Sequence, residues 1–225
     1  MTRTHAVPYY SQWESSALVP DFVAGRSAVE DPLWQKSGAD TREEYAYWAP
    51  RTCGVACLRM ALDHWGLHVP PSVPLARELE QAGAYVRDGD QLKGLIYQPA
   101  ANYITTRWNI PATVDTDLTG EKISTAVAAG SLVILSVHKT IRTLAPRPEH
   151  TGGHLVLSVA ADSDHLYINN PSGFPDHSQS YAPVPWADLT RFSARRGIIL
   201  GAPARSPPGD DLDGCWPGRR QCSSP

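Results

Sequence analysis

Cys53 is the residue of this sequence best placed to act as a nucleophile, because it opens the segment with the clearest helical pattern. Unpaired backbone N–H groups and the positive end of the helix dipole stabilise a thiolate in the first turn of a helix. A free cysteine has a pKa of about 8.5, so this position favours ionisation nearer neutral pH. The alternative is a small buried residue that begins a helix. Cys57 lies one turn later, beside an apolar stripe, and is expected in the core.

A histidine and an asparagine farther along the chain complete a set suited to nucleophilic catalysis. His154 follows two glycines at the start of an apolar strand, which is a good position for a general base. Asn170 ends a later strand, where its amide could hold an imidazole in one tautomer. Each also has an ordinary explanation, a structural histidine at a strand end and a turn before Pro171. The order Cys, His, Asn is that of a cysteine hydrolase.

Four stretches of the sequence form a recognisable set. They read Val-Pro-Tyr-Tyr-Ser-Gln-Trp at 7–13, Thr-Cys-Gly-Val-Ala-Cys-Leu-Arg-Met at 52–60, Gly-His-Leu-Val-Leu at 153–157 and Asn-Asn-Pro-Ser-Gly at 169–173. Together they resemble the C39-like peptidases over about 7–200. The resemblance implies a papain-like fold with Cys53 as nucleophile and His154 as general base. It also implies that Asn170 orients the imidazole and that Gln12 donates to the oxyanion hole. Such a donor contributes about 3 kcal/mol to transition-state stabilisation.

The sequence departs from these relatives in two respects. Many carry Asp where this chain has Asn170, and an amide orients the imidazole without stabilising its positive charge. Activity would then depend more on Cys53 and its helix. Bacteriocin-processing members cut leader peptides after a double glycine during export, but this sequence has no G-x-x-x-x-G-K-[ST] motif, so that coupled role is not supported. The Cys-Gly-[Ser/Ala]-Cys-[Trp/Tyr] pattern of papain itself is also absent.

Composition indicates one globular domain and argues against several other classes of protein. The 225 residues are 42% hydrophobic and 19% charged, which is enough for a substantial core. A net charge of -3 gives no basic excess for binding nucleic acid or an anionic membrane surface. The longest apolar run, 131–137, is too short to span a bilayer. The N-terminus lacks the apolar core of a signal peptide, which predicts a cytoplasmic protein.

The four cysteines form two pairs that need separate explanations. Cys53 and Cys57 have no second cysteine or histidine pair at zinc-binding spacing, so neither a metal nor another cofactor is expected. Cys215 and Cys222 lie in a C-terminal stretch of turn formers and charges without hydrophobic periodicity. A flexible tail is favoured there over a disulfide or a partner-binding segment. The predicted organisation is a papain-like domain over 1–205 and a tail over 206–225.

Helices are expected in the first part of the chain and strands in the second. The apolar spacing predicts a helix from Cys53 to about Trp65, capped by Thr52 and ended by Gly66. Further helices are predicted over 40–48, 75–84, 90–103 and 119–129, and strands over 132–137, 154–160, 166–169 and 197–200. This order is typical of an α+β fold, with a helical N-terminal part packed on a C-terminal antiparallel sheet.

Two groups of residues are candidates for contact with a substrate. The loop over 138–152, which contains Arg142, Arg147 and His150, could line a groove before His154 or could be a solvated connection. Several aromatic side chains could form an apolar subsite near the nucleophile or complete a core. These are Trp13, Trp34, Tyr45, Tyr47 and Trp48.

The sequence therefore predicts a cysteine-dependent peptidase or amidase, acting on a peptide or other amide through an acyl-enzyme. Attack on that intermediate by an amine instead of water would make the same residues a transferase, ligase or cyclase. A third possibility is a non-catalytic module that binds a peptide on the same scaffold. The four site positions carry competent residue types, which favours the enzyme, since a degenerate binder would be expected to lose Cys53 or His154 first.

Overall fold

The computed structural model of the chain describes residues 6–203, except 90 and 146. Its helices are α1 (Val19–Val23), α2 (Arg42–Trp48), α3 (Cys53–His64), α4 (Ser72–Gln81), α5 (Tyr97–Trp108), α6 (Gly120–Ala128) and α7 (Trp186–Phe192). Its strands are β1 (Val86–Asp88), β2 (Gln91–Lys93), β3 (Ala112–Asp115), β4 (Leu132–Val137), β5 (His154–Ala161), β6 (His165–Asn169), β7 (Ala182–Pro185) and β8 (Ser193–Leu200). The proposed tail with Cys215 and Cys222 lies outside the described residues. Within them, every helix is too short or too polar to cross a membrane.

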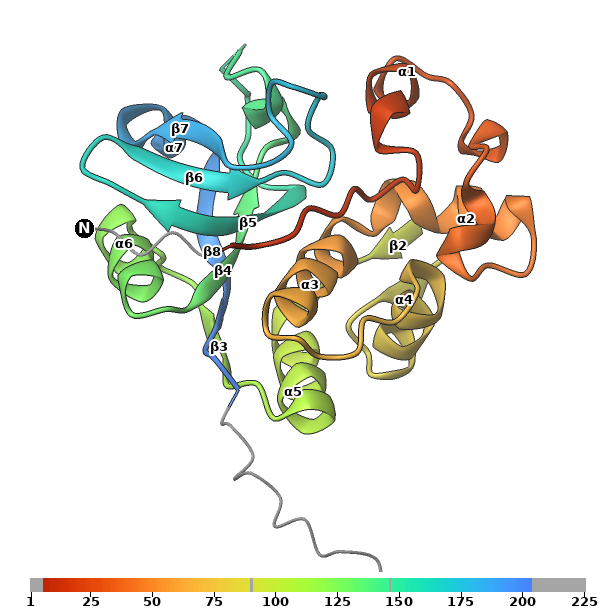
Figure 1. Cartoon of the computed structure of the whole chain (residues 1–225), viewed down its shortest axis with the longest axis horizontal. Helices are drawn as coiled ribbons and strands as arrows, with labels where there is room; N and C mark the ends of the chain where they lie inside the picture. The colour runs from red at the N-terminus through yellow and green to blue at the C-terminus, as the bar shows by residue number, and fades with distance from the viewer. Residues whose placement is uncertain (1–5, 90, 146, 204–225) are drawn as a thin grey trace, which may run out of the picture.

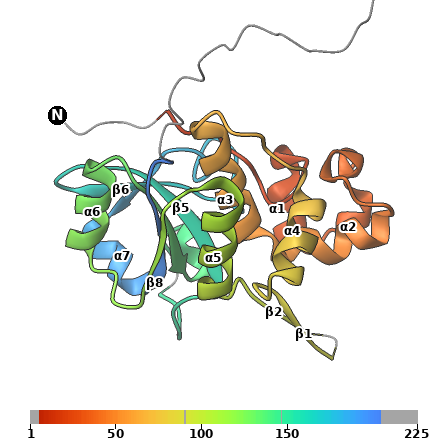
Figure 2. The same ribbon diagram turned by 90° about the horizontal axis from the view of Figure 1, so that it is seen from below.

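A six-stranded antiparallel sheet with the order β3-β8-β4-β5-β6-β7 forms the centre of the fold. Helices α3 and α5 pack on one face, with α4 beside α3, and α6 and α7 pack on the other (Figures 1 and 2). Because successive side chains of a strand point to opposite faces, Ile134 of β4 joins the first core and Leu135 the second. Coverage on both sides explains why β4 and β5 are buried along their whole length.

The structure confirms the α+β prediction and several of its elements. Helix α3 begins at Cys53, as the apolar spacing predicts, and ends at His64. Gly66 has a left-handed φ of +68°, and its N–H donates to the carbonyl of Asp63, 2.9 Å away, as expected of a glycine that ends a helix. The strand predicted over 132–137 coincides with β4.

Two local predictions are wrong. The helix predicted over 90–103 begins only at Tyr97, because the chain before it forms the hairpin of β1 and β2 and then an irregular connection over 94–96. Thr52 does not cap α3 with its side chain. Its hydroxyl instead donates to the carbonyls of Ala49 and Gln12, at 3.1 and 3.4 Å, and so connects the start of α3 to the N-terminal segment.

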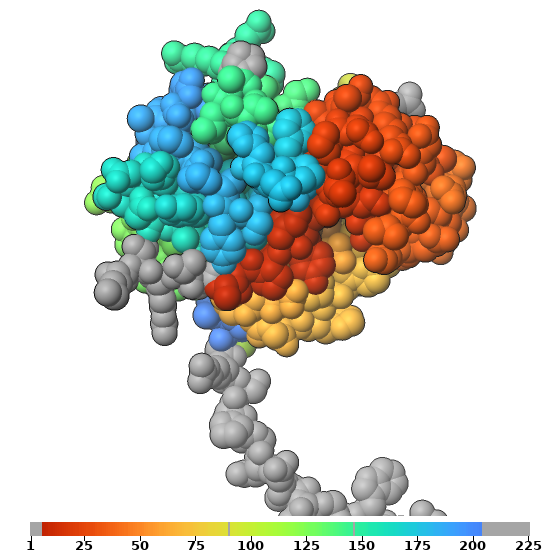
Figure 3. All heavy atoms as spheres, turned by 45° about the horizontal axis from the view of Figure 1, so that its top comes forward, coloured from red at the N-terminus to blue at the C-terminus, as the bar shows by residue number. Residues whose placement is uncertain are grey.

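The N-terminal segment over 7–12 joins the two halves of the fold. It crosses between the sheet and α3 and lies against the loop that follows β6 (Figures 1 and 3). The Tyr9 hydroxyl donates to the carbonyl of Asn170 at 3.0 Å, and the Gln12 N–H donates to that of Pro171 at 3.0 Å. The hydroxyl of Ser11 donates to the same Pro171 carbonyl at 3.1 Å. Residues far apart in the sequence are thereby held around the start of α3.

Candidate active site

Cys53 is the first residue of α3, and its side chain is half-buried. Burial raises the pKa of the thiol, and the backbone N–H groups of Leu155 and Gly54 oppose this rise only in part. The structure therefore differs from the expected thiolate at a helix N-terminus, because desolvation outweighs the favourable dipole. Cys57 is fully buried in the core, as predicted, and burial raises its pKa well above the usual value. A neutral Cys53 thiol needs a base to become a nucleophile.

His154 and Asn170 are in direct contact at the edge of the same region. His154 is the first residue of β5, and its Nε2 lies 2.8 Å from Oδ1 of Asn170 in the loop after β6. Both side chains are buried. The antiparallel pairing of β5 with β6 brings the two residues together, although they are 16 positions apart in the sequence. Asn170 thus fixes the orientation of the imidazole ring.

The hydrogen bonds around Asn170 define the tautomer of His154. Oδ1 of Asn170 accepts the backbone N–H of Ser172 at 3.1 Å, which identifies the atom that faces the imidazole as the amide oxygen. An oxygen there requires that His154 carry its proton on Nε2. Nδ1 then keeps its lone pair. This is the tautomer that a base needs to accept a proton from a thiol.

Ser172 and Arg142 form a second layer behind the imidazole. The Ser172 hydroxyl lies 3.1 Å from Nε2 of His154 and 3.4 Å from Oδ1 of Asn170. Arg142, in the 3-10 helix Lys139–Arg142, donates to that hydroxyl at 2.9 Å. The guanidinium of Arg142 also lies 5.8 Å from the centre of the Phe174 ring. Residue type and spacing do not single out Ser172, although it is part of the Asn-Asn-Pro-Ser-Gly stretch.

Burial and neighbouring charge keep His154 neutral. Burial is the main cause that lowers the pKa of His154 to about 4, and the nearby Arg142 and His138 lower it further. The hydrogen bond to Asn170 opposes the shift. With the pKa of the Cys53 thiol raised and that of the imidazole lowered, the resting pair is a thiol and a neutral imidazole. In such a pair, a thiol that acts as a nucleophile loses its proton during the attack and not before it.

A pocket of about 460 Å³ brings Cys53 and His154 to one surface. Its other lining residues are Gly94, Leu95, Ile96, Tyr97, Ser136, Gly153, Leu155 and Arg196. Among the described residues, no hydrogen bond joins the thiol to the imidazole. In enzymes without substrate such bonds are often long and tighten only when a substrate binds. The pocket is large enough for a peptide side chain beside the two reactive groups.

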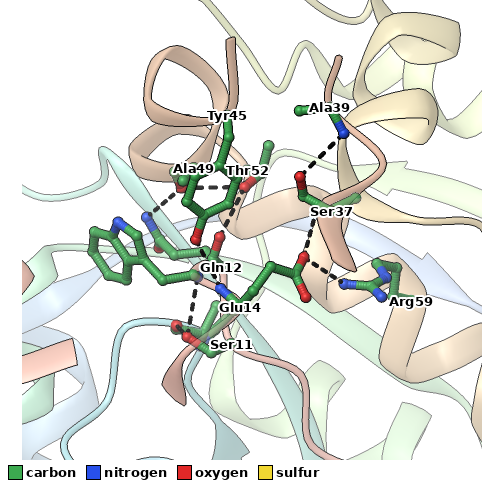
Figure 4. Close-up of polar contacts among 12 residues, drawn as sticks. Ser11, Gln12, Glu14, Ser37, Ala39, Tyr45, Ala49, Thr52 and Arg59 are labelled. Carbon is green, nitrogen blue, oxygen red and sulfur yellow. Dashed lines mark hydrogen bonds and ion pairs between the residues drawn. The ribbon is translucent and has the colours of Figure 1, made fainter. Parts of the chain in front are cut away.

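Gln12 is held next to the start of α3 but does not line this pocket. Its buried side-chain amide donates to the carbonyl of Ala49 at 3.1 Å, and its backbone carbonyl accepts a hydrogen bond from the Thr52 hydroxyl (Figure 4). A carboxamide has two N–H groups, so one remains for another acceptor. The structure therefore brings Cys53, His154 and Asn170 together and places Gln12 beside Thr52, the residue that precedes Cys53.

The two groups considered for substrate contact have different positions. The aromatic side chains Trp13, Tyr45 and Trp48 are buried and complete cores, and none of the aromatic group lines the pocket. Of the loop over 138–152, Arg142 reaches the site through Ser172. In the described part of the chain, no group of three or more His, Cys, Asp or Glu side chains is arranged to hold a metal ion.

Comparisons with known proteins identify the family of this chain. The sequence pattern of the Peptidase_C39 like family matches residues 4–193. A crystal structure of a provisionally named C39-like peptidase from Bacillus anthracis is 20% identical, with a TM-score of 0.47, over 67% of this chain and 88% of the other. No curated protein matches the chain. Because the family pattern covers most of its length, the chain belongs to the Peptidase_C39 like family.

Proposed function

We propose that this protein is a cysteine peptidase or amidase that cleaves a peptide or other amide through an acyl-enzyme. The observation that carries the proposal is the shared pocket of Cys53 and His154, with the imidazole oriented by the Asn170 amide. A thiol at a helix N-terminus, a base with a free Nδ1 and an orienting amide are the parts that acyl transfer to sulfur requires.

In the proposed reaction, the sulfur of Cys53 attacks the substrate carbonyl carbon while Nδ1 of His154 takes the thiol proton. The N–H of Cys53 and the second N–H of Gln12 stabilise the charge that develops on the carbonyl oxygen. The imidazolium then gives its proton to the leaving amine as the carbon–nitrogen bond breaks. Water attacks the resulting thioester with His154 again as base, which releases the acid and restores the thiol.

Alkylation with iodoacetamide tests whether Cys53 and His154 work as a pair. We expect Cys53 to react faster than the buried Cys57, and to slow by at least about tenfold in His154→Ala, since the base no longer accepts the thiol proton. Peptide mapping by mass spectrometry measures each site, and Cys57 in the same sample is the internal control. Equal rates at Cys53 in the wild type and in His154→Ala would contradict the proposal.

The pH dependence of cleavage should show an unusually low acid limit. Only neutral His154 can act as the base, and its pKa is lowered to about 4 by burial. Because the group loses its proton above that pKa, kcat/KM should stay high between pH 5 and 6.5, where an ordinary histidine, with a pKa of about 6.5, is increasingly protonated. A pH profile for any cleaved peptide measures this limit. A limit near pH 6.5 would contradict the assignment of buried His154 as the base.

Two variants control for the cause of this limit. A carboxylate in Asn170→Asp favours the charged imidazolium, so the acid limit should rise by about 1–3 pH units. Ser172→Ala removes the hydroxyl beside the ring without adding charge, and the limit should stay near its wild-type position. If Asn170→Asp left the limit unchanged, a group other than His154 would be setting it.

A further inference from the structure

The active-site pocket contains a cation whose side chain has no partner among the described residues. Arg196 of β8 lines the pocket together with Cys53 and His154. The residue is exposed, and its guanidinium makes no ion pair or hydrogen bond with any described residue. Its neighbour Arg195 instead pairs with Asp117 and lines a different pocket, between α6 and α7. None of the residues that line the active-site pocket is acidic.

An irregularity in the sheet places Arg196 there. Val137 of β4 pairs with Ser193, and Leu135 pairs with Gly197, so Ser136 alone lies opposite residues 194–196 of β8. Such a bulge redirects side chains, and bulges are common beside active sites. The two arginines of this bulge consequently serve different pockets.

A hydroxyl group lies beside the Arg196 guanidinium. A Cβ atom added at Gly152 would lie 3.3 Å from Oγ of Ser136 and 3.4 Å from Nη2 of Arg196. Both polar atoms therefore border the same point, which is open because residue 152 has no side chain. Ser136 is buried, lines the pocket, and its hydroxyl has no hydrogen-bond partner among the described residues. A hydroxyl and a guanidinium that converge without an internal acceptor are suited to bind an anion.

We propose that Ser136 and Arg196 form a carboxylate-binding subsite, so that the substrate carries a negatively charged carboxylate near the bond that is cleaved. This inference rests on the proposed function, because it assigns the group that occupies the same pocket. The guanidinium donates two N–H groups to the carboxylate, and the Ser136 hydroxyl donates a third hydrogen bond. An acidic side chain and a free C-terminal carboxylate both supply this group.

Alkylating reagents that differ only in charge test the subsite. We expect Cys53 to favour iodoacetate over iodoacetamide, and N-iodoacetylglycine over its amide, because the anions bind Arg196. In Arg196→Gln the ratio of the charged to the neutral rate should fall about fivefold or more. The matched control is Arg195→Gln, which loses the same charge outside the pocket and should keep the wild-type ratio. Mass spectrometry of the Cys53 peptide measures all rates.

The outcomes separate this inference from the proposed function. A Cys53 that reacts in a His154-dependent way, but with the same ratio in Arg196→Gln as in the wild type, would overturn the subsite alone. A Cys53 that reacts with none of the reagents would overturn both. Protection of Cys53 by blocked peptides then identifies the source of the carboxylate. The two peptides of the first pair both have an amidated C-terminus and differ only in carrying Glu or Gln. The two peptides of the second pair differ only in having a free or an amidated C-terminus. If neither charged peptide protected Cys53 better than its neutral counterpart, this result would also overturn the subsite.

Discussion

Replacing Cys53 by alanine should lower peptide cleavage by about 10⁴-fold or more, because covalent catalysis ends when its nucleophile is removed. Cys53→Ser is expected to be nearly as inactive. A serine hydroxyl is a much weaker acid than a thiol, and the buried His154, with its pKa lowered to about 4, is too weak a base to deprotonate it. A library of peptides from a digested proteome, analysed by mass spectrometry, supplies substrates and measures the rate of product formation.

Cys57→Ala is the matched control for this experiment. Cys57 lies one turn farther along the same helix and is fully buried, so its loss removes a thiol from the core and not from the pocket. The variant should cleave the same peptides at close to the wild-type rate, with a lower stability from the small cavity. Equal cleavage by the wild type and Cys53→Ala would show that the activity does not belong to this cysteine, and would refute the proposed function.

The parts of the fold that follow from the sequence are those defined by local patterns. The apolar spacing after Cys53 and the glycine at position 66 set the limits of α3, and the apolar run over 132–137 defines β4. Strands β3 and β7 carry no comparable signal. β3 has four residues, none of them fully buried, and β7 contains two prolines, which argue against a strand although its side chains alternate between buried and more exposed. These two strands form because β3 pairs with β8 and β7 pairs with β6, partners that no local pattern of residues identifies.

The candidate site divides in the same way. The types and order of Cys53, His154 and Asn170 point to a site from the sequence alone. The contact of Arg142 with Ser172 spans 30 positions, and it depends on how the loop after β4 folds back. Arg196 gives no signal at all, because its place in the pocket results from a bulge between β4 and β8. Long-range geometry of this kind has no counterpart in residue spacing.

The ion pair of Glu14 with Arg59 connects the N-terminal part of the chain to α3, and breaking it should strongly destabilise the fold. Both side chains are only 10% exposed, and Nη1 of Arg59 lies 3.7 Å from Oε1 of Glu14 (Figure 4). Glu14 also accepts the Ser72 hydroxyl at 2.8 Å, and the Arg59 guanidinium stacks 4.5 Å from the centre of the Tyr10 ring. Burial lowers the pKa of Arg59 and Glu14 counteracts it, as expected of a charge that depends on its partner.

Arg59→Met should therefore lower the free energy of unfolding by about 3–5 kcal/mol, because it leaves the Glu14 carboxylate buried without its counterion. The double variant Glu14→Gln/Arg59→Met removes both charges. It should lower the free energy of unfolding by clearly less than the sum of the losses in Glu14→Gln and Arg59→Met. Arg26→Met breaks surface ion pairs with both Asp21 and Glu30 and should cost at most about 1 kcal/mol. Urea unfolding measures the wild type and every variant. Since Glu14 follows Gln12 by two positions, Arg59→Met should also loosen Gln12, the proposed oxyanion donor, from Ala49 and Thr52. A loss in Arg59→Met no larger than in Arg26→Met would mean that the hydrogen bonds of 7–12 to the loop after β6 hold this segment without the ion pair.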